Sequence, residues 1–107
     1  LHKITLLFEE EKYFSRNNLS LADLARAVKE PSHYVSQVIN EKLDKNFFDL
    51  LSAYRIEEAK KLLHDKAGEQ LTIEEIAGQV GYNSKAAFNK AFKEITGTTP
   101  SAFRSEK

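Results

Sequence analysis

The stretch from residue 71 to residue 104 reads LTIEEIAGQVGYNSKAAFNKAFKEITGTTPSAFR and predicts two short amphipathic helices joined by a tight turn. Apolar side chains recur at the spacing i, i+3, i+4, i+7, which gathers them on one helical face. They are Ile73, Ile76, Ala77 and Val80 in the first helix and Phe88, Ala91, Phe92 and Ile95 in the second. Gly81 lies between them, and glycine adopts a left-handed backbone at little cost. This arrangement is typical of a helix-turn-helix.

Residues that commonly begin and end helices mark the boundaries of this stretch. Thr72 and Glu75 form the pattern of a capping box at the start of the first helix. Asn83 is predicted to cap the second helix, and Gly97 is predicted to end it. Pro100 then fits the first position of a last short helical turn.

The same motif occurs earlier in the chain, which therefore contains an internal repeat. Ser20 is predicted to cap a helix whose apolar positions match those of the later copy at an offset of 73 − 21 = 52, namely Leu21, Leu24, Ala25 and Val28. The next helix matches at an offset of 88 − 35 = 53 through Val35, Val38 and Ile39. Lys29 stands where the later copy has Gly81, so this turn is either strained by about 1 kcal/mol or differently shaped. Pro31 is predicted in the first turn of the second helix.

The remaining segments predict the domain organisation. Residues 1–15 are expected to form one packing helix with its apolar side chains inward, namely Ile4, Leu7, Phe8 and Phe14. Residues 47–63 read as one helix of about 25 Å, a rigid spacer between the motifs. Residues 64–70 read as a loop. We thus predict a first helix-turn-helix subdomain at 1–46, a linker helix at 47–63 and a second subdomain at 64–107.

Composition restricts the class of protein. The 107 residues are 41% hydrophobic, with four glycines and two prolines, and no alternating β-branched run appears, so the fold class is predicted to be all-α. There is no cysteine, His2, His33 and His64 are scattered, and no carboxylate pair has the spacing of a metal or acid–base site. No apolar run of membrane-spanning length and no signal peptide is seen. We expect neither an enzyme nor a cofactor.

Charge leaves two function classes open. Sixteen basic and sixteen acidic residues cancel, but residues 79–105 carry Lys85, Lys90, Lys93 and Arg104 against Glu94, 4 − 1 = +3. The local excess favours DNA binding, whereas zero net charge slightly favours a helical protein-interaction module without DNA binding of its own. Salt dependence separates the two, because phosphate contacts make affinity fall with salt concentration.

In a helix-turn-helix the second helix enters the major groove, so its outward residues are candidate DNA contacts. They are Ser32, His33, Ser36, Gln37 and Asn40 in the first copy and Lys85, Ala86, Asn89, Lys90 and Lys93 in the second. Lysine can donate to guanine, asparagine can pair with adenine, and alanine can touch a thymine methyl group. Base contact is favoured for Lys85, Lys90 and Gln37. For Ser32, Asn40 and Lys93, contact with phosphate and plain solvent exposure remain equal alternatives.

Two longer runs carry a family resemblance. GYNSKAAFNKAFKEITGTTPSAFR at 81–104 and YRIEEAKKLL at 54–63 resemble the AraC/XylS family of bacterial transcription regulators, and SLADLARAV with HYVSQVINEK extends the match back to Ser20. The resemblance implies a seven-helix domain whose two helix-turn-helix units, joined by a long helix, enter successive major grooves. Carried over by position, it implies base reading by His33, Ser36, Gln37, Lys85, Ala86, Ala87, Asn89 and Lys90. The phosphate candidates are Ser32, Asn40 and Lys93 from the outward positions of the helices, and Arg104 near the C-terminal end.

Two arginines at family positions have open roles. Arg55 is expected to be structural, either paired with a helix carboxylate or covering the core with its stem. Arg104 is expected either to contact phosphate or to tie down the C-terminal end.

The resemblance also bears on the whole protein. It implies a sequence-specific double-stranded DNA-binding domain of a bacterial regulator, more often an activator, acting as a dimer or within a larger sensor protein. RNA polymerase and an N-terminal sensor or dimerisation region are the implied partners, and the first residue, Leu1, agrees with a piece of a longer protein. We expect no small-molecule site in this chain and a cytoplasmic location, with tethering to a membrane sensor left open.

Overall fold

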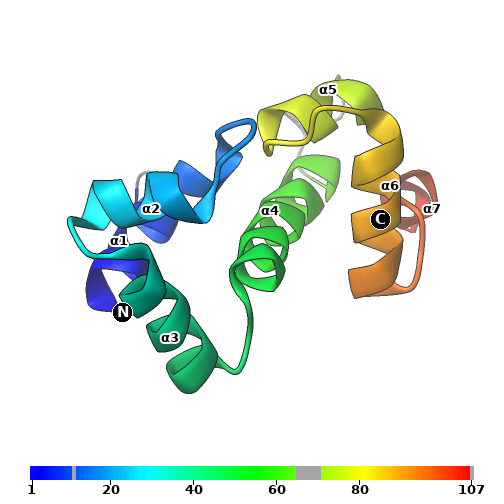
Figure 1. Ribbon diagram of the computed structural model, residues 1–107. Coiled ribbons are helices and arrows are strands. Elements are labelled where there is room, and N and C mark those ends of the chain that lie inside the picture. The colour runs from blue at the N-terminus through cyan, green and yellow to red at the C-terminus, as the bar shows by residue number, and fades with distance from the viewer. Residues whose placement is uncertain (11, 65–70, 107) are drawn as a thin grey trace.

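The computed structural model describes residues 1–10, 12–64 and 71–106. Within these ranges it contains seven α-helices, one 3₁₀ helix and no strand, so the predicted all-α class is confirmed (Figure 1). The elements are α1 (His2–Glu10), η1 (Tyr13–Ser15), α2 (Leu21–Val28), α3 (Ser32–Leu43), α4 (Phe47–His64), α5 (Ile73–Gln79), α6 (Lys85–Thr96) and α7 (Pro100–Ser105). The loop predicted at 64–70 lies, apart from His64, outside the described residues.

The long helix α4 runs between two groups of helices, α1 to α3 on one side and α5 to α7 on the other (Figure 1). The pairs α2–α3 and α5–α6 are the two copies of the repeat, with first residues offset by 73 − 21 = 52 and 85 − 32 = 53. The molecule measures 42 × 23 × 22 Å along its principal axes. None of the helices in the described ranges combines the length and the apolar character needed to cross a membrane.

Two separate hydrophobic cores lie on either side of α4 and share it. The first buries residues of α1, η1, α2 and α3 against the start of α4, including Phe8, Phe14, Leu24 and Ile39. The second buries residues of α5 and α6 against the end of α4, including Ile76, Val80, Phe88 and Phe92. The helix predicted as a spacer therefore also forms a wall of both cores, with Phe47, Leu50 and Leu51 in the first and Ile56, Ala59 and Leu63 in the second.

Both copies of the motif begin with a capping box. The Asp23 backbone N–H donates to Ser20 Oγ at 3.1 Å, and the Ser20 backbone N–H donates to Asp23 Oδ2 at 3.0 Å. The corresponding distances between Glu75 and Thr72 are 3.0 and 2.9 Å. Because the backbone hydrogen bond favours the ionised carboxyl group, it lowers the pKa of Asp23 and of Glu75. The predicted caps at Ser20 and Thr72 are thus confirmed.

The starts of α3 and α6 differ from prediction. Ser84, not Asn83, caps α6, because its Oγ accepts the Ala87 backbone N–H at 3.1 Å. Asn83 instead donates to Asn18 Oδ1 at 2.7 Å. Pro31 lies at the N-cap of α3 with an extended ψ of 146°, one position before the predicted first turn. Both shifts are of one residue, which local capping preferences alone do not resolve.

Three of the turn residues discussed in the sequence have a left-handed backbone. Gly81 has φ +109° and Gly97 has φ +83°, as expected at left-handed positions. Lys29 is left-handed as well, with φ 59° and ψ 42°. Of the two possibilities for the first turn, the structure therefore shows the strained one.

The helix predicted over residues 1–15 ends at Glu10, and Lys12 has φ 49° before η1 begins. Phe8 and Phe14 are both buried in the first core, where their ring centroids are 6.2 Å apart. In one continuous helix these two residues would point roughly 120° apart, since each residue turns the chain by about 100°. The break lets both rings reach the same core.

Ile95 also departs from the predicted pattern. It continues the apolar spacing of Phe88 and Phe92, which are fully buried, yet 47% of Ile95 is exposed. Its side chain lines a surface hollow between α4 and α6, together with Asp49 and Glu94. The helical spacing places Ile95 on the inner face, but its side chain faces this surface hollow instead of a buried core.

Candidate nucleic-acid interface

Each recognition helix, α3 and α6, is anchored by two buried side chains one turn apart. In α3 these are Val35 and Ile39, and in α6 they are Phe88 and Phe92. The anchors match at one offset, because 88 − 35 = 53 and 92 − 39 = 53. The outward positions of the two helices therefore match at the same offset.

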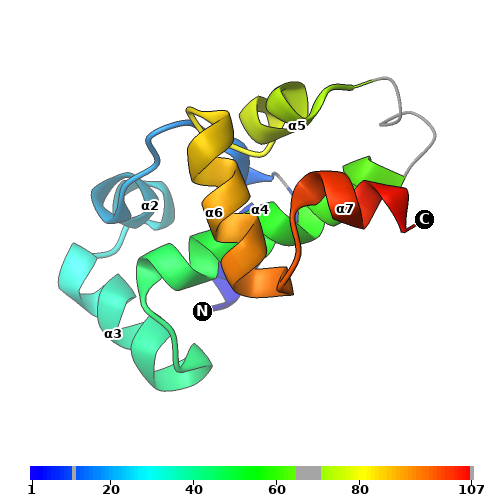
Figure 2. The ribbon, with the colours of Figure 1, turned by 90° about the vertical axis from the view of Figure 1, so that its right-hand side faces the viewer.

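These matched positions form what we call the outward rows. The outward row of α3 is Ser32, His33, Ser36, Gln37 and Asn40, and that of α6 is Lys85, Ala86, Asn89, Lys90 and Lys93. Ser36 and Asn89 are half-buried, and the other members are exposed. Ala87, also predicted to contact bases, is exposed on the first turn of α6. In Figure 2, α3 and α6 lie on the left of α7 and the C-terminal end. The structure thus presents every predicted base-reading residue on one of the two recognition helices.

The two rows differ in charge. The α6 helix carries three lysines and Glu94, whereas Glu41 and Lys42 cancel in α3. Neither helix has an acidic residue in its first turn. The partial positive charge of each helix N-terminus therefore meets no acidic side chain within the first turn, and α6 with its three lysines presents the stronger attraction to an anionic surface.

Sequence reasoning missed Tyr34 and Glu41, both exposed on α3. Tyr34 is 49% exposed and corresponds to Ala87 by the repeat, since 87 − 34 = 53. Glu41 Oε1 accepts a hydrogen bond from Gln37 Nε2 at 3.1 Å and so occupies one amide donor of a predicted base-reading residue. The repeat offset could have identified Tyr34, and the i, i+4 spacing could have identified the Gln37–Glu41 pair.

Arg104 has a structural role. Its Nη1 donates to the Leu71 carbonyl at 2.8 Å, which ties α7 to the segment before α5. Beside it, the His64 and Phe103 rings stack with centroids 4.2 Å apart, and His64 Nε2 lies 3.0 Å from the Phe103 carbonyl. Of the two roles that the sequence left open, the structure shows the tie at the C-terminal end.

Arg55 is structural too, but its partners are not the predicted carboxylate. Its Nε donates to the Phe14 carbonyl at 2.8 Å and its Nη2 to the Arg16 carbonyl at 3.0 Å. Burial lowers the pKa of Arg55, but a guanidinium begins so far above neutral pH that it remains charged.

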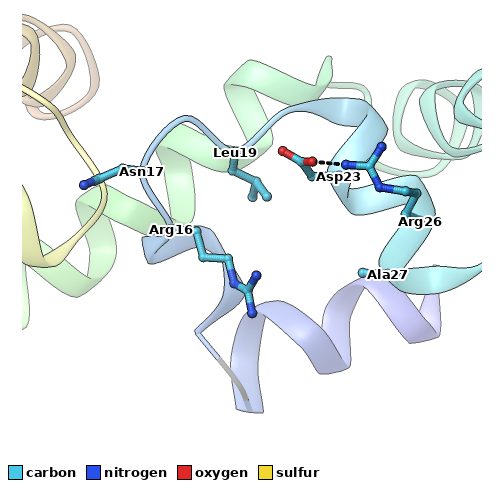
Figure 3. A pocket seen from close by; sticks show the side chains of 6 residues that line it. All are labelled: Arg16, Asn17, Leu19, Asp23, Arg26 and Ala27. Carbon is cyan, nitrogen blue, oxygen red and sulfur yellow. Dashed lines mark hydrogen bonds and ion pairs between the residues drawn. The ribbon is translucent and has the colours of Figure 1, made fainter.

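A polar pocket beside α2 lies outside the outward rows (Figure 3). Asp23 and Arg26, both on α2, form an ion pair at its edge, and Asp23 also accepts the capping hydrogen bond from the Ser20 backbone. The lining carboxylate is therefore already engaged in the fold. The described part of the chain contains no group of three or more histidine and acidic side chains placed to hold a metal ion.

The chain matches the family described as a helix-turn-helix domain over residues 24–106, which include both recognition helices. A solved transcriptional regulator from Chromobacterium violaceum, described as having an AraC-type DNA-binding domain, shares its fold with a TM-score of 0.77 at 20% identity. The chain belongs to the AraC family. As such it is a DNA-binding domain of a transcription regulator, and the resemblance noted in the sequence is confirmed.

Similar proteins span a range of identities. The AraC-type chain is 28% identical over 107 residues to the HTH-type transcriptional regulator YtdP of Bacillus subtilis, covering 100% of this chain but 13% of that protein. It is 31% identical to the C-terminal domain of AraT, a response regulator from Geobacillus stearothermophilus, with a TM-score of 0.85 over 99% of this chain and 83% of that one. The DNA-binding domain of AdpA, solved with a target DNA, shares the fold at 17% identity, with a TM-score of 0.84 over 98% and 89% of the two chains.

Proposed function

We propose that this domain reads double-stranded DNA by placing α3 and α6 in two successive major grooves. The observation that carries the proposal is the pair of matched outward rows, held by one shared helix on two equivalent anchors. Successive major grooves on one face of a duplex are about 34 Å apart. The 42 Å length of the molecule is sufficient to span that distance.

The chemistry of the rows supports a division of roles. Lys85 and Lys90 donate to guanine, Asn89 pairs with adenine, and Ala86 and Ala87 touch thymine methyl groups. In α3, His33, Ser36 and Gln37 read base edges through hydrogen bonds alone. The remaining residues, at the ends of the rows, contact phosphate. Ser32 is the first member of the α3 row, and Asn40 and Lys93 are the last members of the α3 and α6 rows.

The chain covers 13% of the length of YtdP, so the proposal for the whole protein goes beyond this domain. The family resemblance supports a larger bacterial regulator that dimerises or carries a sensor region, contacts RNA polymerase and mostly activates transcription. A DNA-binding domain of this kind acts by binding rather than catalysis, in the cytoplasm where the DNA lies.

Selection of bound duplexes from a random pool tests the proposal directly. We expect two short enriched blocks about one helical turn apart. For the selected duplex, the logarithm of affinity should fall linearly with the logarithm of salt concentration, by roughly 0.9 per phosphate neutralised. A different outcome would be no enrichment at low salt, either for the domain or for its fusion to an unrelated dimer. That outcome would favour a protein-interaction module, a function that the zero net charge of the chain supports.

Removing a negative charge from the α3 row should strengthen binding. Glu41 is exposed and faces the same groove as Gln37 in the proposed complex. The variant Glu41→Gln keeps a partner for Gln37 but removes repulsion from phosphate, so we expect tighter binding by about 0.5–1 kcal/mol. Titration of the selected duplex measures this, with Glu57→Gln on α4 as a control that makes the same charge change away from α3 and α6. Equal gains in both variants would mean that net charge, not position, matters.

A further inference from the structure

Direct contacts join the segment before α2 to the turn before α6, and Arg55 of α4 is at the centre of this junction. Arg55 is 8% exposed, the one charged side chain that is buried in the described ranges. It holds the carbonyls of Phe14 and Arg16, which belong to η1 and the segment before α2. A buried guanidinium placed on two carbonyls fixes that segment against α4, since moving either carbonyl would leave a buried charge unpaired.

The same guanidinium touches the turn that leads into α6. Arg55 Cζ lies 5.0 Å from the centroid of the Tyr82 ring. At Gly81 an added Cβ would lie 2.8 Å from Arg55 Nε and 2.9 Å from the Phe14 carbonyl oxygen. The turn between α5 and α6 is therefore packed directly on Arg55 and on the backbone of η1.

A hydrogen bond closes the junction on its outer side. Asn83 Nδ2 donates to Asn18 Oδ1 at 2.7 Å, across 65 residues of sequence. Asn18 has φ 59°, a conformation that asparagine adopts more readily than most residues. In Figure 1 the blue loop before α2, which carries Asn18, approaches the yellow turn before α6, which carries Asn83. Ser84, which caps α6, follows Asn83 directly, so this contact holds the start of the recognition helix.

We infer that Arg55, Asn18 and Asn83 are positioning residues that set the distance and rotation between α3 and α6, and with them the base-pair spacing that the domain accepts. The inference rests on the proposed reading of two grooves. The corresponding turn between α2 and α3, at Lys29 to Pro31, is exposed. The contacts of the junction are therefore made by the turn before α6 and not by the turn before α3. Each base pair inserted between two half-sites shifts the second by about 3.4 Å and about 35°. If the junction is rigid, α6 cannot follow this shift, and binding at a wrong spacing is weaker.

The test uses duplexes in which the spacing between the two selected blocks is changed by one or two base pairs in either direction. We expect the wild type to bind about tenfold or more weakly at a spacing wrong by one pair. The variant Arg55→Lys has a single ammonium group that cannot hold both carbonyls. In this variant a spacing wrong by one pair should weaken binding by only about threefold or less, and binding at the best spacing should be weaker than in the wild type. The variant Asn83→Ala removes the exposed hydrogen bond and leaves the left-handed Asn18 in place, so it should broaden the profile without entering the core. Lys60→Ala, on the surface of α4, should keep the wild-type profile.

A distance measurement tests the same inference without DNA. The chain has no cysteine, so Glu41→Cys with Glu94→Cys places one spin label on each recognition helix. The distribution of label distances should be narrow in the otherwise wild-type protein and broader in the Arg55 and asparagine variants. Folded variants with unchanged distributions and unchanged spacing profiles would overturn the inference, because a merely stabilising role lowers affinity equally at every spacing. Failure of the wild type to bind any duplex would count against the proposed function. The label distances would still decide whether the junction fixes α3 and α6 relative to each other.

Discussion

The double variant Lys85→Ala, Lys90→Ala is expected to lose specific DNA binding by about 2–6 kcal/mol, since each lysine on a base edge contributes about 1–3 kcal/mol. Both side chains are exposed on the N-terminal half of α6. Titration of the selected duplex against wild type and variant measures the loss. If either lysine contacts phosphate instead, the slope of affinity against salt flattens and sequence preference is retained.

The control for this variant is Lys60→Ala, Lys61→Ala on α4. It changes the net charge of the chain from 0 to −2, as the α6 variant does, but leaves both outward rows intact. We expect a small loss that disappears as salt is raised, because distant charges are screened. If the two double variants lost equal affinity at every salt concentration, α6 would have no special role in the interface.

Gly81→Ala is expected to lower the free energy of unfolding by about 2–5 kcal/mol, from backbone strain of about 1–2 kcal/mol and overpacking of about 1–3 kcal/mol. Gly81 has φ +109°, and its added Cβ would meet the Phe14 carbonyl at 2.9 Å, a backbone atom that Arg55 holds in place. Thermal unfolding followed by circular dichroism should show a Tm lowered by about 8 °C or more.

The other glycines provide matched controls that separate strain from crowding. Gly97 has φ +83° but no atom within 4 Å of an added Cβ, so Gly97→Ala should cost only the strain, about 1–2 kcal/mol. Gly78 lies inside α5 with open space around it, so Gly78→Ala should stabilise the fold by about 0.5–1 kcal/mol. Equal losses at Gly81 and Gly97 would show that the contact with Phe14 and Arg55 contributes nothing.

Local patterns in the sequence were sufficient for most of the fold. Capping boxes, glycines at left-handed positions and apolar spacing depend on residues within one or two turns of each other. They correctly predicted the caps at Ser20 and Thr72, the ends of α5 and α6, and the extent of α4 to within one residue. The repeat offset also placed the outward rows of α3 and α6, because a helix anchored on one face must expose the other. Which of those residues contact DNA stays a prediction.

Tertiary structure decided what depends on residues far apart in the chain. Asn83 contacts Asn18 instead of capping α6, Arg55 binds the carbonyl of Phe14 instead of a carboxylate, and Arg104 binds that of Leu71, across 65, 41 and 33 residues. A side chain with several possible partners takes the one that folding brings near, and no local pattern names it. The sequence alone thus determined the two recognition helices and their outward residues, whereas their placement relative to each other depends on contacts that exist only once both cores have packed against α4.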